Sequence, residues 1–223
     1  MGLQQMKRDK DKIEITYDAV AKEYAEEFST EHEKKPKDRE MLARFALEIR
    51  GKRPVWDFGC GPGQTTKFLS DLGIEISGLD LSEGMVEQAR TLYPDIHFQK
   101  GDLLNLAFES DSIAAVVSLY SIVHFTKEQV GTALGEIFRV LRPGGVFLFS
   151  YHIGTETIHI DSFLNHDVDI DFMFFTNEFI RGCLENCGFE GIEIIERPPY
   201  PDVEYQSRRA YVFACKPDSV DSR

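Results

Sequence analysis

The sequence predicts an α/β fold in which helices cover both faces of a mostly parallel sheet. Short apolar runs alternate with segments of helical periodicity over residues 54–152, a rhythm typical of βαβ units. Parallel neighbours need a crossover connection, and such crossovers are right-handed. Near the end of the chain only residues 197–207 separate two strand-like segments. Because so short a link favours an antiparallel pair, we expect a doubly wound, Rossmann-like sheet with an antiparallel last strand.

The region before the sheet is expected to hold a tail and two helices. Residues 1–12 are polar and charged, which indicates a mobile tail. Apolar side chains recur every three or four positions over 13–28, as on one face of an amphipathic helix. The polar stretch 31–38 interrupts this period, and Pro36 suits the first turn of a second helix that runs to about residue 50.

The sheet region predicts strands and helices in alternation. The expected strands are 55–58, 75–81, 97–100, 113–119 and 146–152. The expected helices are 63–72, 82–92 and 127–141. Ser82 can cap the second helix, because a serine hydroxyl accepts from the first turn. The sequence Arg142-Pro-Gly-Gly145 is expected to end the third, since proline and glycine interrupt a helix.

The last third of the chain is less regular. Residues 153–172 are polar, and we interpret them as an insertion or lid. A helix over 176–187 is expected to stop at Gly188, and two strands, 191–196 and 208–216, complete the sheet. The expected organisation is a tail at 1–12, one domain over 13–216 and a tail at 217–223, with cap helices at 13–50 and substrate-side insertions at 153–172 and 197–207.

Composition and charge exclude several classes of protein. The chain has 223 residues, with 25 Lys and Arg against 38 Asp and Glu, and a net charge of −13. Affinity for nucleic acid rests mainly on basic side chains, so this balance argues against that partner. No apolar run approaches the ~20 residues of a membrane span, no apolar signal segment begins the chain, and four irregularly spaced cysteines do not suit a disulfide framework. We expect a cytoplasmic protein that binds neither nucleic acid nor membranes.

The segment Asp57-Phe-Gly-Cys-Gly-Pro-Gly63 carries the most chemical information. It lies between a short strand and a helix, and its glycines let the backbone pass close to a ligand. In the dinucleotide fingerprint G-x-G-x-x-G the third glycine stands five positions after the first, whereas Gly63 stands four after Gly59. Asp57 would also repel a pyrophosphate. The loop therefore favours a cationic ligand with an amino group over a dinucleotide.

Two further acids follow the next two strands. Asp80 ends the second strand, 21 residues after Gly59, where a carboxylate can accept both ribose hydroxyl protons. Asp102 follows the third strand, near the position of an adenine edge. Each acid alone would equally fit a turn or a helix cap. Because the carboxyl ends of parallel strands line one crevice, the three acids in this order favour a nucleoside ligand.

Taken together, these residues resemble the class I S-adenosylmethionine-dependent methyltransferases. The resemblance is nearest to the small-molecule type related to the enzymes of ubiquinone and menaquinone biosynthesis, and it spans about residues 13–216. It is carried by Asp57-Phe-Gly-Cys-Gly-Pro-Gly, Gly78-Leu-Asp80-Leu-Ser, Gly101-Asp102-Leu and Leu141-Arg-Pro-Gly-Gly145. It implies a seven-stranded sheet with an antiparallel last strand, S-adenosylmethionine as methyl donor and a small-molecule acceptor.

The resemblance also implies which residues bind the donor. Asp57 and the glycine loop would face its methionine part, Asp80 its ribose and Asp102 its adenine. Tyr17 and Tyr24, in Tyr-Asp-x-x-Ala-x-x-Tyr, resemble the helix that closes over the donor, with core aromatics as the alternative. The full set of candidates is Tyr17, Tyr24, Asp57, Gly59, Cys60, Gly61, Gly63, Asp80, Leu81, Met85, Gly101, Asp102, Leu103 and Ser118.

Catalytic candidates follow the fourth strand, in the stretch Ser118-Leu-Tyr-Ser-Ile-Val-His124. Methyl transfer requires collinear reacting atoms, and it requires a base only if the acceptor must lose a proton. His124 is the leading base, because an imidazole with an ordinary pKa of ~6.5 is neutral at pH 7 and would give a rate limb at about pH 6–7. Tyr120 and His152, at the end of the fifth strand, are further candidates. The alternative is a histidine that pins a backbone turn.

Two other clusters are better explained without metal or redox chemistry. His152, His159 and His166 lie seven apart with acids nearby, but this spacing matches no compact ligand motif. We expect solvated lid residues there and no metal site. Cys183 and Cys187 lie one helical turn apart, which suits helix packing.

The residues alone leave three functions open. They are methyl transfer from S-adenosylmethionine to a small molecule, nicotinamide-dependent oxidation or reduction on a similar fold, and binding of S-adenosylmethionine without turnover. The glycine spacing and Asp57 argue against the nicotinamide cofactor. Net charge argues against RNA, and Leu-Tyr-Ser stands where exocyclic-amine DNA methyltransferases carry an Asn-Pro-Pro-Tyr motif. We interpret the chain as a small-molecule methyltransferase, either a monomer or a homodimer.

Overall fold

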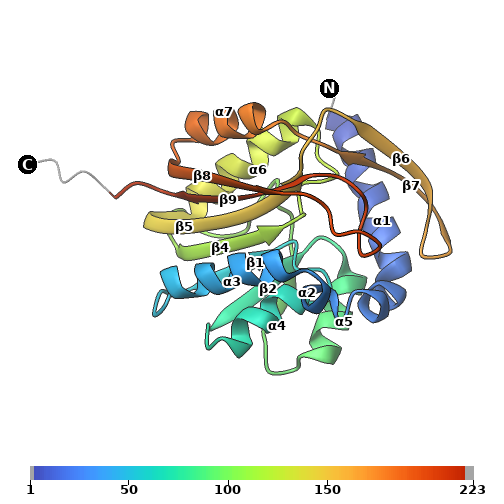
Figure 1. Ribbon diagram of the computed structural model, residues 1–223, viewed down its shortest axis with the longest axis horizontal. Coiled ribbons are helices and arrows are strands. Elements are labelled where there is room, and N and C mark those ends of the chain that lie inside the picture. The colour runs from blue at the N-terminus through green and yellow to red at the C-terminus, as the bar shows by residue number, and fades with distance from the viewer. Residues whose placement is uncertain (1–2, 219–223) are drawn as a thin grey trace, which may run out of the picture.

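The expected sheet is present in the computed structural model, which describes residues 3–218 (Figure 1). Its strands are β1 (Val55–Phe58), β2 (Ile76–Asp80), β3 (Phe98–Lys100), β4 (Ile113–Leu119), β5 (Leu141–His152), β8 (Glu190–Arg197) and β9 (Arg209–Cys215). Their order is β3-β2-β1-β4-β5-β9-β8. Neighbours from β3 to β5 are parallel, and β9 is antiparallel to both β5 and β8. The predicted seven-stranded sheet with an antiparallel last strand is therefore confirmed.

Helices cover both faces of this sheet (Figure 1). α6 (Lys127–Val140) and α7 (Asn177–Cys187) lie on one face, and α3 (Pro36–Glu48) and α4 (Gln64–Asp71) lie on the other. α5 (Glu83–Leu92) packs against β2 and β3. Phe147 and Phe149 stack at 4.8 Å between ring centroids in the layer of α6 and α7, whereas Leu148 packs in the layer of Phe45 and Leu69. Alternate residues of β5 thus fill two apolar layers, as a central strand requires.

Local signals set the ends of several helices. The Ser82 hydroxyl accepts a hydrogen bond from the Met85 amide, which confirms the expected cap of α5. α7 ends at Gly188, whose φ of 96° suits glycine. β5 begins at Leu141 and not at the expected residue 146. The Pro-Gly-Gly sequence that was expected to stop the helix therefore also forms the first part of the strand.

The N-terminal segment differs from the expectation of a mobile tail over residues 1–12. α1 extends from Leu3 to Glu27, and the short helix α2 (Glu31–Lys34) follows it. No turn residue separates the polar stretch from the amphipathic one, and lysine and glutamine are good helix formers, so one helix continues through both. Lys10 of α1 forms an ion pair with Asp102 at 2.8 Å. Residues 1–2 and 219–223 of the two expected tails lie outside the described residues.

The insertion at 153–172 is a β-hairpin of β6 (Thr157–Phe163) and β7 (His166–Met173). Its turn residues Leu164 and Asn165 have φ values of 49° and 66°, the left-handed pair that suits a two-residue hairpin loop. Side chains alternate between two faces: Ile158 is partly buried, whereas His159 is exposed. The polar residues that made this segment resemble a loop are therefore the outer face of a strand pair.

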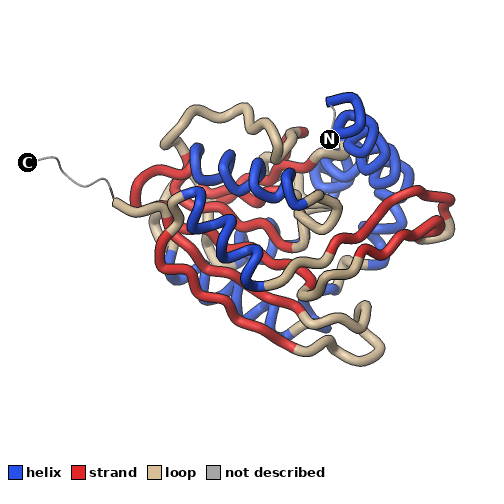
Figure 2. Tube along the Cα trace, turned by 90° about the horizontal axis from the view of Figure 1, so that it is seen from above, coloured by secondary structure: helices blue, strands red, loops and turns tan. Residues whose placement is uncertain are grey.

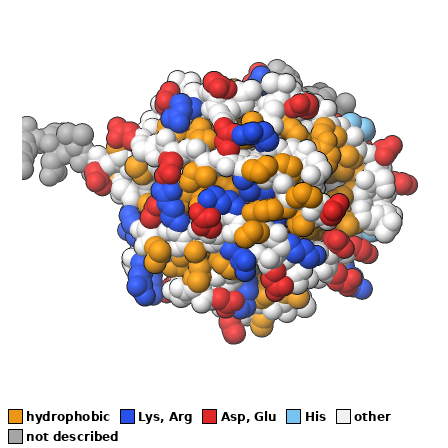
Figure 3. All heavy atoms as spheres, viewed as in Figure 1, with side chains coloured by type: hydrophobic (Ala, Val, Ile, Leu, Met, Phe, Trp, Pro, Cys, Tyr) orange, Lys and Arg blue, Asp and Glu red, His pale blue; other side chains and the backbone are white. Residues whose placement is uncertain are grey.

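The hairpin and α1 lie side by side beyond the carboxyl ends of the parallel strands (Figures 1 and 2). Acidic side chains gather at this edge in Figure 3, and the exposed residues of β7 include Asp167, Asp169 and Asp171. Within residues 3–218, no helix combines the length and apolar character that crossing a membrane requires. α1 and the inner face of the hairpin thus cover the strand ends, where the ligand site is expected.

Candidate active site

The loop between β1 and α4 is held against β2 by its backbone. The amides of Gly59 and Cys60 both donate to the Leu79 carbonyl, at 2.7 and 3.0 Å. Gly59 has a φ of 73°, and a Cβ added there would lie 2.5 Å from the Cβ of Ser121, so only glycine fits. Gly61 also has a positive φ, of 53°, but a Cβ there would meet no atom within 4 Å. The loop therefore presents open space at Gly61.

Asp80 is fixed beside that space. Its Oδ2 accepts from the Gly61 amide at 2.8 Å, and its Oδ1 accepts from the Ser82 amide at 2.9 Å. Burial raises the pKa of Asp80, whereas these amides stabilise the carboxylate. A carboxylate has about four acceptor positions, so two remain for the hydroxyl groups of a ligand.

A cavity of about 160 Å³ lies at this point, between the strand ends and α1. It brings together most of the predicted site residues. Those that line it are Tyr17, Tyr24, Gly59, Cys60, Gly61, Asp80, Leu81, Met85, Asp102, Leu103, Tyr120 and His124. The prediction that the acids at successive strand ends line one crevice thus holds for Asp80 and Asp102 but not for Asp57.

Four predicted donor-binding residues do not line this cavity, and each has another role. Asp57 is buried behind the loop and accepts from the Thr66 hydroxyl at 2.7 Å; burial raises its pKa to about 7. Ser118 donates to the Phe58 carbonyl at 2.7 Å. A Cβ at Gly63 would lie 2.9 Å from the Phe98 ring, and one at Gly101 would lie 2.4 Å from Leu79, so both glycines serve close packing.

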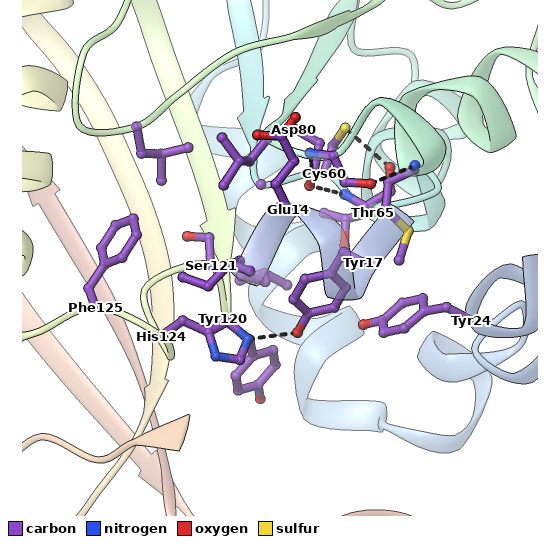
Figure 4. Close-up of a pocket in the computed structure, with 18 of the residues that line it drawn as sticks. Glu14, Tyr17, Tyr24, Cys60, Thr65, Asp80, Tyr120, Ser121, His124 and Phe125 are labelled. Carbon is purple, nitrogen blue, oxygen red and sulfur yellow. Dashed lines mark hydrogen bonds between the residues drawn. The ribbon is translucent and has the colours of Figure 1, made fainter. Parts of the chain in front are cut away.

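His124 and Tyr17 form a hydrogen-bonded pair across the cavity (Figure 4). Nε2 of His124 lies 2.7 Å from the Tyr17 hydroxyl, and Nδ1 lies 2.8 Å from the backbone carbonyl of Asp171 on β7. Because a carbonyl can only accept, Nδ1 carries the proton and Nε2 accepts from Tyr17. Burial lowers the pKa of His124 to about 4, which corrects the ordinary value assumed from the sequence. The imidazole is neutral at pH 7 and is a weaker base than expected.

A second cavity, of about 410 Å³, adjoins the first on the side of the hairpin. Tyr17, Tyr24, Glu31 and Tyr120 line both cavities. The apolar lining of the second cavity comprises Phe28, Val123, Ile158, Ile160, Phe163, Phe172, Phe174 and Val203. Its walls include the inner face of the hairpin and the loop after β8, the two segments interpreted from the sequence as substrate-side insertions.

The two other catalytic candidates lie at the second cavity: Tyr120 lines both cavities, and His152 lines the second. Tyr120 has a φ of 55°, a region in which bulky side chains are strained and which is frequent at functional sites. Its amide donates to the Ser150 carbonyl at 3.2 Å. His152 lines the second cavity only; its Nδ1 lies 2.6 Å from the Ser207 hydroxyl, and its ring stacks on Phe174 at 5.0 Å. Burial lowers the pKa of His152 to about 3.

A buried cluster of charges closes the end of the second cavity. Glu204, in the loop after β8, accepts from Arg197 at 3.0 Å and lies 3.2 Å from Nε of Arg209. Arg197 also contacts Asp38 of α3 at 3.1 Å, and Lys35 lies 3.6 Å from Glu204. Every charge in this cluster thus faces an opposite charge, which buried ionic groups require.

Sequence reasoning missed several residues that line the first cavity. Glu31 and His32 belong to the stretch interpreted as a break between helices, and Gln64 opens α4 beside the glycine loop. None of them belongs to a motif with a fixed spacing. Their place depends on how α2 packs against α4, which the local pattern does not indicate.

Comparisons with known proteins agree with this geometry. Residues 55–145 match the family model described as a methyltransferase domain. A probable S-adenosylmethionine-dependent methyltransferase of Mycolicibacterium smegmatis is 37% identical over 110 residues, which are 49% of this chain and 42% of that protein. A demethylmenaquinone methyltransferase of Beutenbergia cavernae is 33% identical over 108 residues, covering 47% of this chain and 44% of that protein. The chain thus spans less than half the length of these relatives.

The fold is also that of solved methyltransferase structures. A crystal structure of a SAM-dependent methyltransferase from Methanosarcina mazei superposes with a TM-score of 0.71 at 16% identity, covering 79% of this chain and 98% of that one. The predicted resemblance is thereby confirmed for both the central domain and the architecture. Residues 55–145 thus match a methyltransferase domain, and the described residues share the fold of solved S-adenosylmethionine-dependent methyltransferases.

Proposed function

We propose that the chain transfers a methyl group from S-adenosylmethionine to a small-molecule acceptor. One observation carries this proposal: the backbone-anchored Asp80 carboxylate and the open Gly61 share a cavity with His124, and a larger apolar cavity adjoins it through common walls. The names of the relatives support the same activity.

The residues present fit the donor. When bound, S-adenosylmethionine supplies an electrophilic methyl group on a sulfonium centre. Asp80 has acceptor positions left for ribose hydroxyls, and Asp102 and Leu103 would hold the adenine. Asp102 already accepts from the Leu104 amide at 2.9 Å and pairs with Lys10. Asp57, behind the loop, would act on the donor only through the position of the loop.

The chain's own groups would orient the reactants and receive a proton. Holding two reactants in line removes much of the entropic cost of a bimolecular step. Where the acceptor is a hydroxyl, its proton can pass to Nε2 of His124, directly or through the Tyr17 hydroxyl. The bond from Nδ1 of His124 to the Asp171 carbonyl would steady the imidazole as it gains charge.

The lining of the second cavity supports a proposal about the chemical character of the acceptor. Its walls are mostly apolar, its buried charges are paired with one another, and His152 is neutral at pH 7. An acceptor with an apolar body therefore suits it. We also propose that the protein is cytoplasmic, that it binds neither nucleic acid nor membranes, and that it is a monomer or a homodimer. Size-exclusion chromatography with light scattering distinguishes these two states.

Calorimetric titration with S-adenosylhomocysteine tests the donor assignment. We expect S-adenosylhomocysteine to bind with a dissociation constant in the micromolar range, about −8 kcal/mol, and NAD not to bind. Labelled S-adenosylmethionine incubated with a pool of small metabolites should then yield labelled product. Tighter binding of NAD would favour the oxidoreductase. Binding of S-adenosylhomocysteine without transfer to any metabolite would contradict the enzymatic part of the proposal.

The substitution Ile158→Lys tests the acceptor cavity. Ile158 faces the cavity, and an ammonium group there would face apolar walls, so binding of a neutral probe such as 2-naphthol should weaken at least ~10-fold, or about 1.4 kcal/mol. Fluorescence titration of the S-adenosylhomocysteine complex measures this. The matched control is His159→Lys, which introduces the same ammonium group on the outer face of the same strand, opposite Asp171. Equal affinity of both variants for the probe would refute the assignment of this cavity.

A further inference from the structure

Two buried polar atoms of residues that line the first cavity, which we assign to the methyl donor, have no hydrogen-bond partner. They are Oε1 of Gln64 and Nδ1 of His32, and both residues line the cavity. Buried polar atoms in folded proteins are nearly always paired, so each unpaired atom needs an explanation. Few such atoms occur among the described residues, and two of them meet in this cavity.

The remaining bonds of these two side chains fix their orientation. Nε2 of His32 lies 3.0 Å from the Thr65 hydroxyl, and Nε2 of Gln64 donates to Oε2 of Glu31 at 3.5 Å. The amide nitrogen of Gln64 is thus directed at Glu31, which leaves its oxygen free. Glu31 also pairs with Lys35 through its other oxygen, Oε1. Residues of α2 and of the first turn of α4 therefore form one group.

The acceptor atoms of these side chains suit a cation that carries N–H donors. The free Gln64 oxygen can only accept. Burial lowers the pKa of His32, so its imidazole is neutral at pH 7, and Nδ1 accepts when Nε2 donates to Thr65. Glu31 adds a carboxylate. Acceptors with a neighbouring negative charge match an ammonium group.

We propose that Gln64, His32 and Glu31 bind the α-ammonium group of the methyl donor's amino-acid end. This inference rests on the proposed function, because it assigns one end of the same cavity. Asp80 and Asp102 serve the nucleoside end, and the open backbone of Gly61 lies in the cavity they share. These three side chains would make the contact to the donor's amino group that we had expected of Asp57 from the sequence.

Calorimetry with two ligands tests the assignment. S-adenosylhomocysteine carries the α-ammonium group, whereas 5′-S-(3-carboxypropyl)-5′-thioadenosine lacks only that group. The unaltered chain should bind the first at least 10-fold more tightly. Gln64→Met should weaken S-adenosylhomocysteine at least 10-fold and leave the deamino analogue unchanged within twofold. Gln64→Glu keeps the acceptor oxygen and should retain the affinity for S-adenosylhomocysteine.

A second variant guards against local misfolding. His32→Leu should show the same selective loss, and unchanged binding of the deamino analogue shows that the nucleoside end is intact. Equal weakening of both ligands in Gln64→Met and His32→Leu, or no weakening of S-adenosylhomocysteine, would overturn the inference alone. If the unaltered chain bound neither ligand, the proposed function would fail and this inference with it.

Discussion

Replacing His124 by Asn is expected to lower turnover about 100-fold or more while the affinity for S-adenosylhomocysteine stays within twofold. General-base assistance contributes ~10²–10⁴ in rate, or roughly 3–5 kcal/mol. Asparagine retains a donor toward the Asp171 carbonyl but has no imidazole nitrogen to take up a proton. Steady-state rates, calorimetry and a melting curve on the same variant provide the measurement.

The control for this experiment is His159→Asn, on the exposed face of the hairpin. It should leave turnover unchanged. If His124 only pinned a turn through Asp171, His124→Asn would lower the melting temperature, and the rate would fall only with the folded fraction. A stable variant with full turnover would exclude His124 as the base.

The pH dependence of turnover also tests whether His124 is the base. Burial lowers the pKa of His124 to about 4, so the active neutral imidazole persists from pH 8 down to about pH 5. Turnover should then fall as the pH passes through about 4, and the limb at about pH 6–7 expected from an ordinary histidine should be absent. The His124→Asn variant should lack this acid limb. Titration of the imidazole by NMR measures the pKa independently.

The second large effect is expected at Asp80. Asp80→Ala should weaken binding of S-adenosylhomocysteine by ~1.5–3 kcal/mol, or about 10- to 150-fold, the scale of lost charge-assisted hydrogen bonds. Part of the loss would come from the amides of Gly61 and Ser82, which lose their acceptor. Calorimetry measures the affinity, and Asp71→Ala, an exposed acid at the end of α4, is the control. Undiminished affinity in Asp80→Ala would exclude a ribose contact.

The sheet could be predicted because each of its signals is local. Apolar runs such as 113–119 and breaks such as Gly188 need no knowledge of the rest of the chain. The hairpin was harder to predict, because its turn pair, Leu164 and Asn165, is not the usual Asn-Gly. Its alternation of apolar and polar residues was the available signal.

The lining of the first cavity could be predicted from the sequence where a residue stands at the end of a strand. Asp80 lies at the end of β2, next to the loop that its carboxylate fixes, and it lines the cavity as predicted. Asp57 is the third of four residues in β1, which are buried throughout, and its carboxylate instead meets Thr66 on α4. Gln64 and His32 required tertiary information, because their unpaired atoms arise only when α2 packs beside α4.

The shared walls of the two cavities have a thermodynamic consequence. Tyr17 and Tyr24 both belong to α1, and each faces both cavities. A ligand in one cavity that orders α1 therefore reduces the entropy that a ligand in the other cavity loses on binding. Linkage is reciprocal for binding free energies, so donor and acceptor should each raise the affinity for the other by the same factor.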